Sequence, residues 1–101
     1  DALTKMLDTS CSSDFEKQIG GFIREQPGVV GIDLLHTRQF GHKIYVDMEI
    51  TVKRDMSLVD AHAIAERVHK NVEENFPNVK HVMIHVNPEE SEAEEAAEKT
   101  D

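Results

Sequence analysis

Six histidines and 20 acidic side chains in 101 residues are the groups of this sequence that could do chemistry. Imidazole nitrogens and carboxylate oxygens are the ligands that proteins offer to zinc and related divalent metals. The spacing shows no acid–base pair and no glycine-rich phosphate loop, and Cys11 has no second thiol beside it. The pattern therefore indicates metal binding and does not predict an enzyme.

Two of these side chains share a face if their segments are strands. Residues 44–53 alternate between apolar and polar side chains, with Asp47 in the polar set. Residues 79–86 alternate as well, and His85 lies opposite Val82, Ile84 and Val86. If helices cover both apolar sets, Asp47 and His85 occupy the uncovered face of one sheet. Two ligands make an incomplete metal shell, and a symmetric dimer would supply four.

A second ligand pair is compatible with the sequence but is not required by it. His62 lies near the start of a predicted helix, and Glu89 follows the last predicted strand. An Asp or a His on an exposed strand face is also a common surface residue, so this alternative stays open for the first pair. The remaining histidines fall at solvated or turn positions, and we assign them no site role: His36, His42, His69 and His81.

Two helices are predicted from capping signals and apolar spacing. Ser13 and Glu16 form a capping box, and the helix ends at Pro27-Gly28. Its apolar face comprises Phe15, Ile19, Phe22 and Ile23. Ser57 with Asp60 begins the second helix, which stops before Pro77. Its apolar stripe comprises Leu58, Ala61, Ala65, Val68, Val72 and Phe76.

Three strands complete the pattern, over residues 29–35, 44–53 and 79–86. The first two are joined by a hairpin with its tip at 40–42. The order helix, strand, strand, helix, strand predicts an α+β fold. We expect a three-stranded, mainly antiparallel sheet with two helices on one face.

Charge and composition divide the chain into three parts. A net charge of −9 argues against a nucleic-acid partner, and no apolar run is long enough to span a membrane. Residues 89–101 hold seven acids and one base, which is typical of a disordered tail. We therefore predict a linker over 1–12, a folded domain over 13–88 and an acidic tail over 89–101.

Four stretches carry a resemblance to a known family, in this order: PGVVGIDLLHTRQFG (27–41), KIYVDMEITV (43–52), SLVDAHAIAERV (57–68) and NFPNVKHVMIHVNP (75–88). From Ser13 to Pro88 the chain resembles the cytoplasmic C-terminal domain of cation diffusion facilitator transporters. The resemblance implies a ferredoxin-like, metallochaperone-like fold and a V-shaped homodimer. It also implies that metal binding closes the V and promotes cation efflux through an attached transmembrane domain, with this part on the cytoplasmic side of the inner membrane.

The resemblance also implies roles for individual residues. Asp47 and His85 match ligand positions in the second and third strands, and His62 matches a ligand on the second helix. Glu89 matches a carboxylate that partners that histidine in some members. Tyr45 matches an aromatic residue beside the central site in some members.

Two positions depart from the zinc- and iron-binding members of the family. Asp33 stands where a histidine is usual, and Asn87 stands where a bridging aspartate is usual. Both are weaker candidate ligands, and they favour a sensor-grade affinity for a divalent metal over a tight binuclear site. Zinc is the ion we expect to bind in vitro, whereas the ligands also suit iron(II) or manganese. The alternatives are a stand-alone ferredoxin-like small-molecule sensing module and a purely structural dimeriser.

Overall fold

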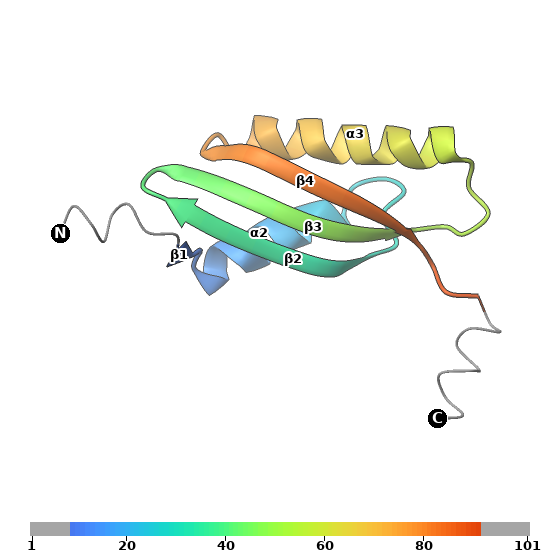
Figure 1. Cartoon of the computed structure of the whole chain (residues 1–101), viewed down its shortest axis with the longest axis horizontal. Coiled ribbons are helices and arrows are strands. Elements are labelled where there is room, and N and C mark those ends of the chain that lie inside the picture. Colours follow the sequence, from blue (N-terminus) through green and yellow to red (C-terminus); the bar gives the residue numbers. More distant parts are fainter. Residues whose placement is uncertain (1–8, 92–101) are drawn as a thin grey trace, which may run out of the picture.

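The computed structural model describes residues 9–91. Its elements are β1 (Thr9–Ser10), α2 (Ser13–Arg24), β2 (Gly31–Phe40), β3 (Lys43–Val52), α3 (Leu58–Asn75) and β4 (Val79–Pro88), as Figure 1 shows. The predicted ferredoxin-like α-β-β-α-β order is confirmed, and β1 is an additional short strand. The parts of the predicted linker and acidic tail that fall on residues 1–8 and 92–101 lie outside the described residues.

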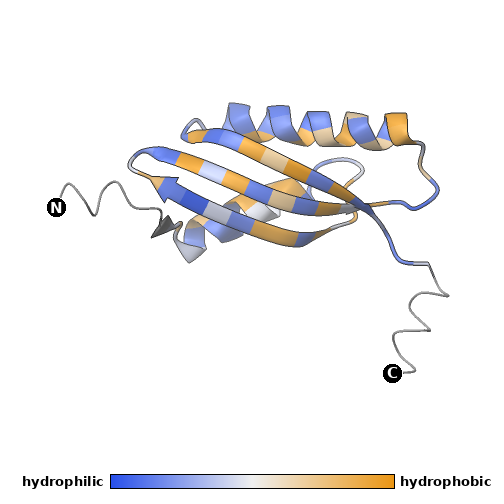
Figure 2. Ribbon diagram, viewed as in Figure 1, coloured by the Kyte–Doolittle hydropathy of each residue, from blue (hydrophilic) through white to orange (hydrophobic). Residues whose placement is uncertain are grey.

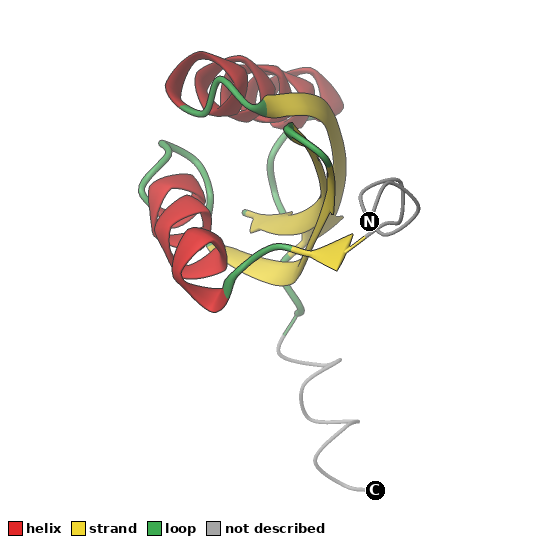
Figure 3. Cartoon of the chain, turned by 90° about the vertical axis from the view of Figure 1, so that its left-hand side faces the viewer, coloured by secondary structure: helices red, strands yellow, loops and turns green. Residues whose placement is uncertain are grey.

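The sheet has the strand order β1-β2-β3-β4. β1 and β3 each pair with β2 in antiparallel fashion, whereas β4 pairs with β3 in parallel because α3 crosses between them. The sheet is thus mainly antiparallel, as predicted. Both helices cover the same side of it, and Figure 3 shows the other side without a helix.

The core lies between the helices and the sheet. β3 supplies one side chain at every second position, and all of these are buried: Ile44, Val46, Met48, Ile50 and Val52. The two helices cover this row with another buried set: Ile19, Ile23, Ile64, Val68 and Val72. Figure 2 shows the resulting alternation of hydrophobic and hydrophilic residues along the strands. The predicted face of the second strand is therefore confirmed.

Both helices begin at a serine cap, but the first does so one residue earlier than predicted. Ser12 has extended backbone angles, and its hydroxyl accepts a hydrogen bond from Phe15 N at 3.1 Å, so the predicted cap Ser13 is already helical. Ser57 accepts from Asp60 N at 3.1 Å, as expected. Leu58 was expected in the buried stripe, but it is 85% exposed because the first turn of α3 makes little contact with the core.

The segment before α2 belongs to the packed fold. Thr9 and Ser10 pair with Gln39 and Arg38, so the chain enters α2 from the free edge of β2. Cys11 follows directly, is 7% exposed and joins the core cluster as a free thiol. Within residues 9–91, no helix is both long enough and apolar enough to cross a membrane.

Gly28 lies in the loop before β2, next to Ile64 of α3, and it provides a test of this contact. Its φ is +92°, and a Cβ there would lie 2.5 Å from Ile64 Cδ1. Gly28→Ala is expected to destabilise the fold by about 2 kcal/mol, because it adds backbone strain to overpacking. Gly31→Ala is the matched control, since no heavy atom lies within 4 Å of its Cβ position. Urea unfolding midpoints measure both, and equal shifts would contradict this account of the loop.

Candidate metal centre on the open face of the sheet

The side of the sheet that carries no helix is the open face. It is formed by the polar positions of β3 together with their neighbours in β2 and β4: Asp33, Leu34, His36, Arg38, Tyr45, Asp47, Glu49, Thr51, His81, Met83, His85 and Asn87. Asp47 and His85 both lie on it. The alternation of each strand puts them there, because the opposite side chains, buried in β3 and buried or half-buried in β4, face the helices.

The register shows which of these side chains are neighbours. Asp47 is level with His36 in β2 and with Met83 in β4. His85 is level with Glu49 instead, so Asp47 is its diagonal neighbour, one step along the face. Glu49 is therefore the nearest carboxylate to His85 by register. Our sequence analysis did not single it out, because only the parallel pairing of β3 with β4 reveals this proximity.

A hydrogen-bond network surrounds the two positions that depart from the family pattern. Asn87 Nδ2 donates to Asp33 Oδ2 and to Glu49 Oε1, both at 3.0 Å. Thr51 Oγ1 donates to the Asp33 carboxylate at 2.8 Å. A β-bulge between Ile32 and Leu34 precedes this contact and resets the register of β2. Asn87 thus bridges two carboxylates that would otherwise repel each other.

These hydrogen bonds hold the pKa of Asp33 below its usual value, chiefly through Asn87 and secondly through Thr51. A lowered pKa means that the folded state favours the ionised carboxylate. Its contribution to stability is present above the ordinary carboxyl range and is lost as the pH falls through the folded value. Asp33 is therefore an anion at neutral pH, available to a cation on the open face.

Farther along the face, aromatic rings lie beside Asp47. Tyr45 lies between Phe40 and His81, with ring centroids 5.2 and 5.5 Å away. Arg38 Nη2 lies 3.5 Å from Asp47 Oδ2. The predicted aromatic neighbour Tyr45 is thus one residue pair away from Asp47 on the same strand face, in contact with a histidine.

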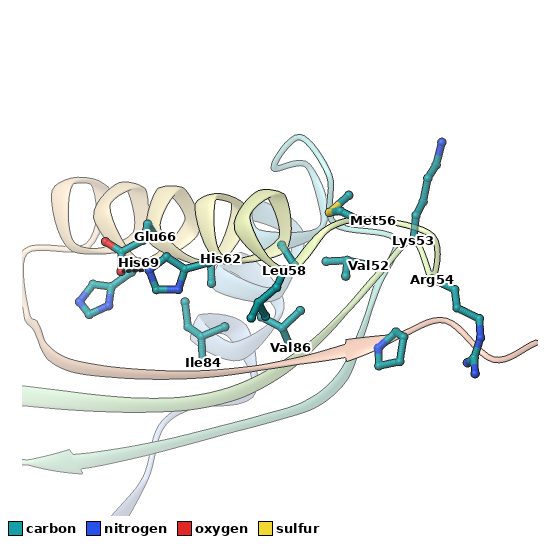
Figure 4. Close-up of a pocket in the computed structure, with 13 residues that line it drawn as sticks. Val52, Lys53, Arg54, Met56, Leu58, His62, Glu66, His69, Ile84 and Val86 are labelled. Carbon is teal, nitrogen blue, oxygen red and sulfur yellow. Dashed lines mark ion pairs between the residues drawn. The ribbon is translucent and has the colours of Figure 1, made fainter.

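The predicted peripheral ligands lie apart. His62 lines a groove of about 470 Å³ between α3 and β4, above Ile84 and Val86, and its Nε2 lies 3.3 Å from Glu66 Oε1 (Figure 4). Glu89 lines a different cavity, with Asp33, Thr51 and Asn87 among its neighbours. The fold therefore does not bring His62 and Glu89 into one pocket, and Glu89 shares its cavity with Asp33, Thr51 and Asn87 of the open-face network.

The donors on the open face fit a divalent metal in kind but not in number. Imidazole and carboxylate groups are suitable ligands for zinc and its neighbours. Among residues 9–91, however, no three His, Cys, Asp or Glu side chains converge closely enough to hold an ion. Within these residues, one chain thus presents fewer converging donors than a metal shell requires.

The network around Asp33 makes a direct prediction. Asn87→Ala is expected to raise the pKa of Asp33 toward its ordinary value, and Thr51→Val is expected to raise it by less, because Asn87 is the larger cause. A carboxyl-carbon NMR titration measures both. Asn71→Ala is the control, since Asn71 lies in α3 and its amide donates to Gln26 Oε1 and not to Asp33. An unchanged Asp33 titration in Asn87→Ala would overturn this assignment.

Solved structures of one domain, the MamM CTD, have the same fold. The chain aligns with the nickel form of a variant of this domain that carries an introduced histidine, at a TM-score of 0.74 and 25% identity, covering 78% of this chain and 100% of that one. The copper form of another histidine-substituted variant of the same domain aligns with a TM-score of 0.73 and 25% identity, covering 76% of this chain and 96% of that one. The fold class is confirmed by both.

Sequence relatives point to the same family. The chain is 31% identical over 88 residues to the cation-efflux pump FieF of Yersinia pestis (strain Pestoides F) and to that of Yersinia pseudotuberculosis serotype O:3 (strain YPIII). The match covers 87% of this chain but only 29% of each pump, so the chain spans less than a third of their length. Residues 11–89 match the family described as "Cation efflux protein, cytoplasmic domain". The chain therefore belongs to the family of cation efflux protein cytoplasmic domains.

Proposed function

We propose that this chain is the cytoplasmic regulatory and dimerisation domain of a divalent metal efflux transporter. Metal ions bind between the open faces of two copies, close a V-shaped homodimer and promote transport by the attached membrane domain. The observation that carries the proposal is the partial ligand set on the open face, where Glu49 lies level with His85 and next to Asp47 along the same face of β3. A second copy would complete the shell.

Electrostatics supports metal-driven closure. Asp33, Asp47 and Glu49 all lie on the open face, and each chain has a net charge of −9. Arg38 offsets the charge of Asp47, but Asp33 and Glu49 leave each face negative. Two such faces repel each other when no cation lies between them, and the repulsion weakens with distance and salt. A divalent ion shared between the faces replaces this repulsion with attraction. Metal binding would then be read out as a smaller distance between the two arms.

Apolar side chains on the same face favour a second copy as the partner. Leu34 and Met83 are 47% and 46% exposed, and they flank the β3 carboxylates on either side. Burial of such side chains contributes roughly 25 cal/mol per Å². The face therefore combines apolar contacts, which suit a permanent dimer, with charged groups that respond to metal.

The central site is proposed to comprise Asp47 and His85 from both protomers. His62 and Glu89 are proposed as weaker peripheral ligands, since each would bind in a separate cavity unless the strand end moved. Zinc is a suitable probe because its N and O ligand preference matches this set. The nickel and copper forms of histidine-substituted MamM CTD variants support the choice of divalent ions as probes.

One prediction of the proposed function concerns the oligomeric state of the chain. Sedimentation of the metal-free chain at micromolar concentration is expected to give about twice the 11.4 kDa chain mass. Zinc should raise the melting temperature, by an amount equivalent to about 2.7 kcal/mol at a hundredfold excess over Kd. Scattering should show a smaller radius on zinc addition. A dimer that ignores every first-row divalent ion would indicate a purely structural dimeriser instead.

The second prediction concerns the ligands. Asp47→Ala combined with His85→Ala should abolish zinc-driven compaction and leave a folded dimer, because neither side chain belongs to the core. His42→Ala and His69→Ala are matched controls and should compact like the parent. The single tyrosine, Tyr45, lies on the open face and provides a fluorescence signal for closure. Compaction that survives the double substitution would show that other residues form the site.

A further inference from the structure

We propose that Arg38 is the resident counter-ion of Asp47 and that an incoming metal ion must displace it, so that Arg38 sets the metal affinity of the open face. The inference rests on the proposed function, because it takes Asp47 to be a metal ligand. Arg38 lies in β2 opposite Tyr45, one step along the face from the residue opposite Asp47. Its Nη2 lies 3.5 Å from Asp47 Oδ2, and this single contact is both the ion pair and the hydrogen bond.

Partial burial places this pair between two extremes. The side chains of Arg38 and Asp47 are 35% and 28% exposed. Water screens the pair less than it screens a fully exposed pair, so the attraction between the two charges is stronger at the same distance. The carboxylate nevertheless remains open to an ion that approaches from solvent. The contact is therefore strong enough to compete with a metal and weak enough to be replaced by one.

The other two carboxylates of the face have a different kind of partner. Asp33 and Glu49 accept hydrogen bonds from the neutral groups of Thr51 and Asn87. A neutral donor leaves the negative charge in place, whereas a guanidinium offsets it. Of these three carboxylates, Asp47 is the one whose charge is already balanced by a contacting cation in the described part of the chain.

Displacement has a predictable size. A divalent ion bound at Asp47 meets the positive charge of Arg38 a few ångströms away, and the original ion pair is lost as well. Together these effects weaken zinc binding by about three- to tenfold at low ionic strength. The difference should shrink as salt rises without vanishing, because the Debye length falls to about 3 Å at 1 M but a partly buried pair is screened less than an exposed one. A purely structural role for Arg38 would show no such salt dependence.

The test is a zinc titration of the full 101-residue chain at low and at high salt. Zinc binding is measured by calorimetry and by Tyr45 fluorescence. Arg38→Gln is expected to bind zinc about three- to tenfold more tightly than the parent at low salt, and this gain should be smaller at 1 M. Arg38→Lys keeps the charge and should stay close to the parent. Arg67→Gln is the matched control: Arg67 donates to the Pro27 carbonyl from α3, so its loss removes the same charge away from the open face.

Asp47→Asn separates failure of this inference from failure of the proposed function. If Asp47→Asn binds zinc like the parent, the proposed central site is wrong. If Asp47→Asn weakens binding but Arg38→Gln leaves it unchanged or weakens it too, the counter-ion role of Arg38 is wrong. The gain from Arg38→Gln should disappear in an Asp47→Asn background. Should Arg38→Gln fail to fold by circular dichroism, Arg38→Met keeps the apolar stem, removes the charge and must give the same gain.

Discussion

Strand β3 has to satisfy two demands at once, and the arrangement of the other elements follows from this. Its buried side chains, from Ile44 to Val52, form the floor of the core, so the intervening positions are turned away from the helices. These positions include Asp47 and Glu49. A shift of one residue in the register would bury both carboxylates and expose the core row. The packing of the hydrophobic core thus fixes the candidate ligands on the open face, although these ligands are not part of the core.

The carboxylates crowded onto one face need partners, and the structure supplies two kinds. Asn87 and Thr51 donate hydrogen bonds that keep Asp33 ionised, whereas Arg38 balances Asp47 with a charge. Asparagine at position 87 is weaker than aspartate as a metal ligand, but its amide joins Asp33 to Glu49 without adding a further negative charge. Asn87 therefore has a physical role in the folded chain that does not depend on a metal ion.

The sequence predicted which face of the sheet each strand residue occupies. It did not predict which residues of adjacent strands lie level with each other. Alternation in β3 and β4 depends on one strand at a time, so it placed Asp47 and His85 on the same side of the sheet. The level of each residue depends on how β4 pairs with β3 after the α3 crossover, and this is a tertiary property. Glu49 was missed as the neighbour of His85 for that reason. The bulge that brings Asp33 to Thr51 likewise leaves no signal in a periodic pattern.

An incomplete site suits a regulatory domain better than a complete one. If one chain held three or four converging ligands, a metal would bind without changing the distance between two chains. On residues 9–91 no such cluster exists, and the ligands lie on a face that another copy can approach. On the proposed function, an ion gains its full shell only when the two faces come together, so part of its binding free energy is available for closure. A resident cation at Asp47 would then raise the concentration of metal at which closure occurs, without altering the geometry of the closed state.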